Sequence, residues 1–382
     1  MTTWLDEAYT LDALFAAWEL VRRKHPGPGV DGVTVEQFTR HLDEHLRALR
    51  RDMRRDTYQP APLLRRYLPK ADGEFRRVGI PTILDRLAQR ALLQAALPRI
   101  DSRLHPASYA YRPGRNIQQA TLQIDGWRAA GGAWVARADI DLCFDSIPHA
   151  PLLARVQSWL GDERAVAAIA RWLTAGVIDG DTYTEGRIGT PQGDILSPVL
   201  CNIYLDQIDR ALARHCHSFV RYADDILIVS HTQSAAEAAL ARAAQAFTAC
   251  QLHLDPQKSR VVSFQQGFKY LGTLFVGSLV LPCVQIVHAD GHVSYTQGYD
   301  DAPSTLSVVH TRQGLIVTAH GGAGTEPALT RAVAEEVHRA RAGAPTAVGQ
   351  ALLAAWRNAK RARTGAARAA ATAGPADWAF VI

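Results

Sequence analysis

The spacing of apolar residues predicts helices at the start of the chain. Leu14, Trp18 and Val21 recur three to four residues apart, which is the period of an amphipathic helix, and similar spacing continues to about residue 55. Glycines and prolines interrupt the pattern at 25–32, where the sequence reads HPGPGVDG. We therefore expect two helices over 11–55, separated by a loop.

Strand-like and helical patterns alternate through the next two hundred residues or so. Expected β-structure is a ribbon over 63–81 with its turn at 71–74, an apolar strand over 134–147, a hairpin over 219–230 and a strand over 268–276. Expected helices cover 83–97, 152–174, the later part of 190–212, and 235–250. This mixture predicts an α+β or α/β fold.

The pattern changes after Gly277. Strand-like runs over 279–287 and 306–317 come first, and an Ala/Arg-rich helical pattern follows over about 330–371. We expect a boundary at this glycine, with one unit over 1–277, a small β-rich segment over 278–325 and a helical region over 326–382.

Composition excludes several classes of protein. The 382 residues carry 42 Lys and Arg against 37 Asp and Glu, a net charge of +5, and 47% hydrophobic residues, which is ordinary for a globular protein. No run approaches the ~18 apolar residues of a membrane span, and the N-terminus does not read as a signal peptide, so we expect a cytoplasmic protein without a membrane partner. The five cysteines are never spaced as CxxC, which argues against a zinc knuckle or a disulfide framework.

Arginines cluster near both ends of the chain. They lie at 22–23, 47–55 and 65–66, and again at 357–368, where no acid lies nearby. Such a run is either a solvated helix face or a surface that binds phosphates, and the pattern alone leaves both readings open.

Three aspartates lie in strongly apolar surroundings. Asp139 lies within AWVARADIDLCFDSI, where an ionised carboxylate costs several kcal/mol unless it is paired or binds a metal. Asp224 and Asp225 lie in the middle of FVRYADDILIVS, a pattern that taken alone is also typical of a solvated hairpin turn. If the two segments lie side by side in one sheet, these carboxylates would suit Mg²⁺ ions that catalyse nucleotidyl transfer.

The chain resembles reverse transcriptases, and among them the bacterial lineage that includes the group II intron-encoded enzymes. The resemblance runs in order from about residue 11 to residue 276. It rests on seven strings: YLPKADGEFRRVGIPTILDRLAQRALL, SYAYRPGRN, ADIDLCFDSI, GTPQGDILSPVLCNIYLD, RYADDILIV, LHLDPQKS and FKYLG.

This resemblance implies a right-hand polymerase of fingers, palm and thumb, in which an antiparallel palm sheet carries the metal carboxylates. It places Asp139, Ile140, Asp224 and Asp225 at a site for two Mg²⁺ ions, for which Mn²⁺ can substitute. Strand alternation favours Asp224 as the stronger ligand of the adjacent pair. Lys258 matches the family's basic residue near the leaving group and is expected to be a general acid. The implied reaction is RNA-directed DNA synthesis from dNTPs.

Further positions match the family's contacts to the incoming nucleotide. Lys70 and Arg76, on either side of the ribbon turn, match triphosphate contacts, with an exposed charged hairpin as the alternative. Phe144 matches the aromatic ring beneath the sugar that favours deoxynucleotides, with core packing as the alternative. Gln192 in GTPQG matches a contact near the nucleotide's 3′ position, and Ile140 belongs to the same group.

The resemblance also implies contacts to an RNA template and to a DNA or RNA primer. The first group would position the template or support the fingers, and the second resembles a hairpin that grips the primer end. These residues are Tyr109, Arg112, Pro113 and Gly114 in the first group, and Phe268, Tyr270, Leu271 and Gly272 in the second.

The biological role stays open at this stage. The region after Gly277 is too short and too β-rich for the usual helical thumb, so 326–382 is either a divergent thumb or another nucleic-acid contact. The run at 304–319 faintly resembles the first strands of a CRISPR integrase, which suggests spacer acquisition or phage defence with such a partner. The alternatives are an intron-associated enzyme with an intron RNA partner, and an RNA-binding maturase-like protein whose polymerase activity is secondary or lost.

Overall fold

The computed structural model of the chain describes residues 3–69 and 75–282, together with the strand segments 284–287, 293–296, 305–311 and 314–320. Lys70, the expected turn at 71–74 and the expected helix over 330–371 lie outside the described residues. Among the residues that are described, no helix is both long enough and apolar enough to cross a membrane.

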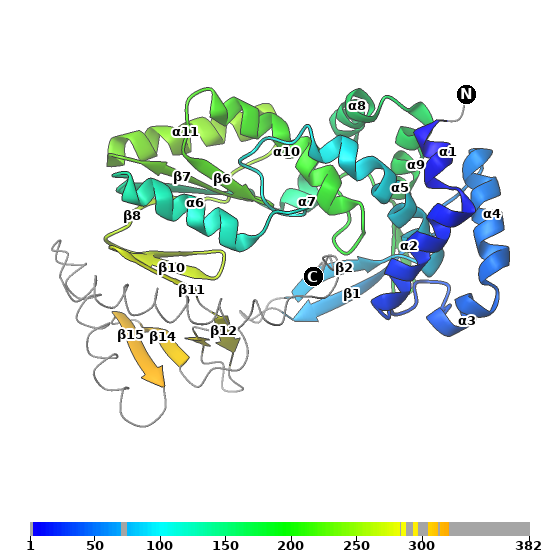
Figure 1. Ribbon diagram of the computed structural model, residues 1–382, viewed down its shortest axis with the longest axis horizontal. Helices are drawn as coiled ribbons and strands as arrows, with labels where there is room; N and C mark the ends of the chain where they lie inside the picture. Colours follow the sequence, from blue (N-terminus) through cyan, green and yellow to red (C-terminus); the bar gives the residue numbers. More distant parts are fainter. Residues whose placement is uncertain are drawn as a thin grey trace, which may run out of the picture.

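The N-terminal helices pack on a long central helix. They are α1 (Trp4–Ala8), α2 (Leu11–Arg23), α3 (Val35–Arg40) and α4 (Leu42–Arg54). The single helix expected between the loop at 25–32 and residue 55 is divided at His41 into two, and a short helix that was not expected precedes residue 11. Threonine side chains at positions 3, 10 and 34 cap the first three by accepting hydrogen bonds from backbone N–H groups. Their buried faces meet α5 (Ile83–Asp101), which runs through the core (Figure 1).

A ribbon extends beside this helical layer. Strands β1 (Leu63–Pro69) and β2 (Phe75–Ile80) pair antiparallel, and β4 (Val177–Asp179) and β5 (Thr182–Thr184) complete a sheet of order β2-β1-β4-β5. Residues 63–69 and 75–80 therefore form the two strands of the expected ribbon.

A second sheet lies at the centre of the other half of the molecule, in the order β6-β7-β3-β8. Its strands are β6 (Phe219–Tyr222), β7 (Asp225–Ser230), β3 (Trp134–Asp139) and β8 (Arg260–Ser263). The side chains of β3 and β7 alternate between two cores. One core faces α10 (Ser197–Ala213) and α11 (Gln233–Ala249), and the other faces α6 (Ile117–Ala129).

The core on the α6 side also includes a small three-stranded sheet. It consists of β9 (Phe268–Tyr270), β10 (Thr273–Val276) and β11 (Leu279–Pro282), and Figure 1 shows it beside α6. Beyond it, β12 (Val284–Val287) pairs with β13 (Val293–Thr296), and β14 (Thr305–Thr311) pairs with β15 (Gly314–His320). The antiparallel pairing confirms the α+β expectation.

Three further expected elements are interrupted. The strand over 134–147 ends at Asp139, because Leu142 adopts a left-handed conformation (φ 44°) and α7 (Cys143–Ser146) follows. The helix over 152–174 divides at Gly161 into α8 (His149–Leu160) and α9 (Glu163–Thr174). The strand over 268–276 is a hairpin, since positive φ values at 271 and 272 reverse the chain.

Candidate active site

Asp139 and Asp225 face each other at one end of the β6-β7-β3-β8 sheet. Asp139 ends β3, Asp225 begins β7, and the two are direct cross-strand partners. Their side chains are only 17% and 20% exposed. Because direct partners have Cβ atoms about 5 Å apart on the same face, two carboxylates here repel one another unless cations lie close by.

Each of these two aspartates is paired with its own cation. Lys258 Nζ lies 3.3 Å from Asp139 Oδ1 and 3.1 Å from Asp255 Oδ2. Arg137 donates through Nη2 to Asp225 Oδ2 at 2.9 Å. Each carboxylate of the facing pair thus has a cation beside it, and the expected role of Lys258 as a general acid stays a prediction.

Asp224 lies on the turn beside this pair. Tyr222 pairs with Asp225, so the turn between β6 and β7 consists of Ala223 and Asp224 alone. Ala223 is held in the left-handed region at φ 58°, which is costly for a residue with a Cβ atom. No ion pair joins Asp224 to a cation within the described ranges 3–69 and 75–282, although Arg76 and Lys258 are near enough to affect its pKa.

Arg221 supports this turn from the side of α10, a role that the sequence did not predict. Its side chain is fully buried, pairs with Asp209 at 2.7 Å, and donates to Asn202 Oδ1 at 2.8 Å and to Ser108 Oγ at 2.9 Å. It also donates through Nη1 to the carbonyl oxygen of Ala223 at 2.9 Å. One available signal was the arginine inside the apolar run FVRY, since a buried guanidinium requires a carboxylate partner.

Burial raises the pKa of all three aspartates. Desolvation is the largest cause for each, and it raises the pKa of Asp225 to about 7 even though Arg137 opposes it. For Lys258, partial burial lowers the pKa, but the hydrogen bonds to Asp255 and Asp139 outweigh it and leave the pKa above its ordinary value. For each carboxylate, the loss of solvation therefore raises the pKa more than the neighbouring cations lower it, as expected of groups that bind a cation.

The donor atoms at this end of the sheet fit Mg²⁺. Asp225 Oδ1 is buried without a hydrogen-bond partner, and hard carboxylate oxygens are the ligands that Mg²⁺ prefers. In the part of the chain that the structure describes, no group of three His, Cys, Asp or Glu side chains is arranged to hold a metal ion by itself. One or two carboxylates suffice for Mg²⁺ where substrate phosphates supply the other ligands.

The backbone adds a further oxygen beside the turn. Ile140 forms an isolated antiparallel bridge with Leu254, and Asp255 N donates to Asp139 O at 2.9 Å. Since successive carbonyls of an extended chain point to opposite sides, the Ile140 carbonyl is directed toward the turn that carries Asp224. The expected place of Ile140 in the metal site stays a prediction.

The GTPQG loop joins the two halves of the molecule near this site. Thr190 N donates to Phe144 O at 2.6 Å, and Gly79 N of β2 donates to Gln192 O at 2.6 Å. A Cβ atom at Gly189 (φ 83°) would lie 2.8 Å from Phe144 O, so only glycine fits there. The loop therefore fixes the half-buried Gln192 and the half-buried Phe144, whose ring packs against the main core, relative to the ribbon.

The basic side chains of the ribbon approach the same end of the sheet. Arg76 is exposed and lies close enough to Asp224 to lower its pKa. Its neighbour Arg77 forms an ion pair with Asp145 of α7 at 3.8 Å. The structure thus brings Arg76 near the carboxylates, while the position of Lys70 is not described.

Arg112 is an internal support. It is buried, pairs with Asp101 at 2.7 Å, and donates to the carbonyl oxygens of Asp101, His105 and Ser108. A guanidinium committed in this way cannot reach a phosphate without breaking these bonds. Of the two roles expected for it, the geometry favours supporting the fingers.

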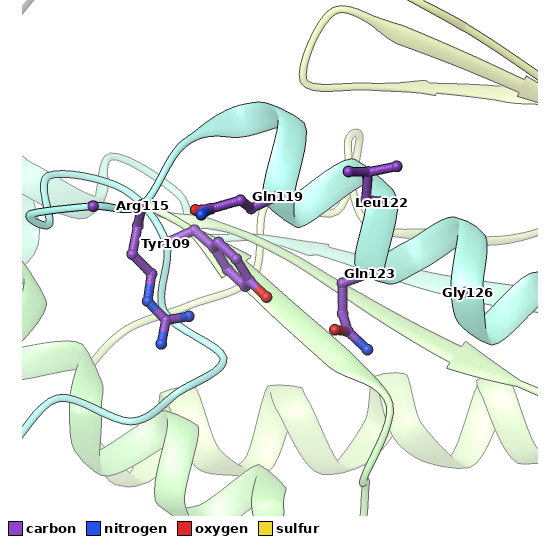
Figure 2. A pocket seen from close by; sticks show the side chains of 7 residues that line it. Tyr109, Arg115, Gln119, Leu122, Gln123 and Gly126 are labelled. Carbon is purple, nitrogen blue, oxygen red and sulfur yellow. The ribbon is translucent and has the colours of Figure 1, made fainter. Parts of the chain in front are cut away.

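The other expected template residues border an open cavity of about 610 Å³. Figure 2 shows Tyr109 and Arg115 from the loop that precedes α6, next to Gln119 and Gln123 of α6. The Arg115 guanidinium lies over the Tyr109 ring at 5.0 Å. Gly114 also lines the cavity, and Pro113 precedes it.

The expected primer-grip residues form the β9–β10 hairpin. Phe268 and Tyr270 are buried in the core on the α6 side, while Leu271 and Gly272 form the turn with φ values of 49° and 68°. Tyr270 donates its hydroxyl to the carbonyl oxygen of Asp225 at 3.0 Å. The hairpin therefore abuts the carboxylate site directly.

Known proteins that are similar in sequence indicate the family of this chain. Protein YkfC of Escherichia coli (strain K12) is 31% identical over 284 residues, which cover 64% of this chain and 74% of YkfC. The group II intron-encoded protein LtrA of Lactococcus lactis subsp. cremoris is 32% identical over 186 residues, 48% of this chain and 31% of LtrA. The chain thus spans most of one relative but only about a third of the other.

Among solved structures, one chain of a "Partial Cas6-RT-Cas1--Cas2 complex" aligns with a TM-score of 0.41 and 27% identity, covering 65% of this chain and 43% of that chain. The family described as "Reverse transcriptase (RNA-dependent DNA polymerase)" matches residues 68–275, more than half of the chain. This match includes both strands of the carboxylate site, the GTPQG loop and the β9–β10 hairpin, and the chain belongs to the reverse transcriptase family.

Proposed function

We propose that this chain is an RNA-directed DNA polymerase that extends a primer on an RNA template with dNTPs. The observation that carries the proposal is the facing pair of Asp139 and Asp225, with Asp224 on the adjoining turn, at a desolvated sheet end. A protein that only bound RNA would not benefit from three carboxylates where phosphates pass, which disfavours the maturase-like alternative.

The proposed metal ligands are Asp139, Asp224 and the Ile140 carbonyl, with Asp225 adjoining them. Reverse transcriptases depend on divalent metal ions, and we propose two Mg²⁺ here, replaceable by Mn²⁺. Bound there, Mg²⁺ would lower the pKa of the primer 3′-hydroxyl and neutralise charge on the leaving pyrophosphate.

Side chains of this protein would donate the proton and hold the nucleotide. The primer 3′-oxygen attacks the α-phosphorus of the dNTP. The bond between the α-phosphorus and the oxygen that bridges it to the β-phosphate breaks, and pyrophosphate leaves. Lys258, whose Nζ lies 3.3 Å from Asp139 Oδ1, would donate a proton to that pyrophosphate. Arg76, with Lys70, would hold the triphosphate, while Gln192 and Phe144 would contact the sugar.

Nucleic acid would lie along the surfaces already described. We propose that the template contacts Tyr109, Pro113 and Gly114 and the arginine face of α4, and that the primer end rests on the β9–β10 hairpin. The arginine face of α4 consists of Arg47, Arg50, Arg51 and Arg54. The region beyond residue 277 would contribute a divergent thumb or a further contact, as a separate unit.

The direct test is extension of a labelled DNA primer annealed to an RNA template or to a DNA template of the same sequence. We expect Mg²⁺-dependent extension on RNA that requires dNTPs. A chain that binds the RNA duplex yet extends neither primer would contradict the proposal and support the maturase-like alternative.

The genes that neighbour this one would identify the cellular partner. We propose either an intron RNA or a CRISPR integrase as partner, in keeping with the group II-like sequence of the catalytic region. An adjacent CRISPR array would support spacer acquisition, and flanking intron RNA structure would support the intron role. A defence island without either element would point to another phage-defence role.

A further inference from the structure

Arg137 joins the carboxylate site to the β9–β10 hairpin. It lies in β3, two residues before Asp139 and on the same face. Its Nη2 donates to Asp225 Oδ2 at 2.9 Å, and its Nη1 donates to Lys269 O at 3.0 Å. The same guanidinium lies over the Tyr270 ring, 5.6 Å from the centroid. One side chain thus contacts two different sheets.

A second bond ties the hairpin to the same aspartate. The buried Tyr270 hydroxyl donates to the backbone carbonyl of Asp225 at 3.0 Å. The end of β10 is also tied by Gly277 N, which donates to Phe264 O at 2.7 Å, and Phe268 and Phe275 pack on the Phe264 ring. Apolar packing is non-directional, so the polar links fix how the hairpin is oriented against Asp225.

The arrangement of Arg137 is not the one that stability alone would favour. Its Nε–H is buried without an acceptor among the described residues, and its cross-strand partner in β8 is another cation, Arg260. An unpaired buried donor and a facing like charge both oppose folding. The side chain is half-buried and held between Asp225 and Lys269, where only a planar fork with several N–H donors reaches both acceptors.

We propose that Arg137 is a positioning residue for the polymerase reaction. It holds the β9–β10 hairpin against Asp225 so that a primer end resting on the hairpin is aligned with the palm carboxylates. This inference rests on the proposed function, and its test therefore includes a readout that does not need polymerase activity.

The test compares Arg137→Lys with Arg260→Lys. Lysine keeps the charge at 137 but cannot bridge both acceptors, while Arg260 is exposed and lies directly opposite in β8. We expect Arg137→Lys to speed amide hydrogen exchange in residues 268–276 about tenfold and to slow single-turnover dNTP incorporation about tenfold. Primer–template affinity should change less than twofold. Arg260→Lys should alter none of these by more than twofold.

Tyr270→Phe provides a second variant that removes only the hydroxyl bond. We expect the same two changes, each smaller than for Arg137→Lys. Unchanged exchange in 268–276 in both variants would overturn the proposal, and so would faster exchange without any loss of incorporation rate. If the parent chain extends no primer, the polymerase proposal fails, and parent-like exchange in Arg137→Lys would overturn the coupling in its own right.

Discussion

The Nη1 atom of Arg221 lies 2.9 Å from the carbonyl oxygen of Ala223. This bond connects a fully buried ion pair with Asp209 of α10 to the strained residue that precedes Asp224. The left-handed conformation of Ala223 is therefore maintained by a group that is itself fixed by the helix below. Asp224 is positioned by the core of the palm and not by the turn alone.

Removing Arg221 should unfold the chain more readily. We expect Arg221→Met to lower the free energy of unfolding by about 3–5 kcal/mol, because it leaves Asp209 buried without a cation. Combining Arg221→Met with Asp209→Leu should restore part of this loss. Urea unfolding checks both variants, and equal stability of the two would mean that the buried charge is not the cause.

The same double variant separates folding from catalysis. Because the bond to Ala223 stays absent, we expect incorporation at least tenfold slower than the parent at a temperature where the protein is folded. Parent-like incorporation would show that Asp224 does not depend on Arg221.

Phe144 should select against ribonucleotides. It lies beside the GTPQG loop and packs only partly into the core, so Phe144→Ala should fold. We expect the ratio of ribonucleotide to deoxynucleotide incorporation to rise about tenfold, since no ring would clash with the 2′-hydroxyl. Competition between matched nucleotides measures the ratio, and an unchanged ratio would leave Phe144 with core packing alone.

Asp194, which follows the GTPQG loop, should make stability depend on pH. Burial raises its pKa to about 7, partly opposed by hydrogen bonds from the backbone of Ile195 and Leu196. A carboxyl whose folded pKa is raised stabilises most below its unfolded pKa near 4, and this contribution is lost as the pH rises to about 7.

We therefore expect the stability of Asp194→Asn, relative to that of the parent, to increase as the pH rises. The difference in the free energy of unfolding should grow by about 1 kcal/mol per pH unit between pH 5 and 7 and level off above that. Denaturant unfolding at several pH values measures it. A difference that shrinks with rising pH would reverse the assigned direction.

The arginine face of α4 should bind nucleic acid through phosphates. All four arginines of this face line an open cavity of about 380 Å³, but Arg47 and Arg51 are each also paired with a carboxylate on the same helix. We expect Arg50→Gln and Arg54→Gln each to weaken template binding whatever the template's sequence. Each should also reduce the slope of log affinity against log salt concentration by about 1. Arg47→Gln is the matched control, with a smaller effect.

Local patterns predicted the elements of the site but not its charge pairing. Asp139 and the pair at 224–225 stood out because acids interrupt apolar strands. The sequence left open whether the two segments lie side by side, and the structure pairs β3 with β7 so that Asp139 faces Asp225. The left-handed Leu142, which ends the strand early, has no sequence signal, since leucine rarely adopts that conformation.

The arginine partners depend on long-range packing. Arg137 binds Asp225, 88 residues later, and Lys269 O, 132 residues later, so no local spacing reveals either bond. Arg221 could be flagged as a buried cation, but its partner Asp209 lies on a helix whose rotation against the sheet is set by the whole core. Tertiary packing, and not local propensity, decides these contacts.

The most direct test of the account is single-turnover addition of one dNTP to a DNA primer on RNA, with Mg²⁺ varied. We compare the parent with Asp224→Asn and Asp139→Asn, and measure RNA-duplex binding in parallel. We predict that both variants lose at least a thousandfold in rate while binding the duplex within about threefold of the parent. Incorporation by either variant at the rate of the parent would contradict the assignment of the metal site.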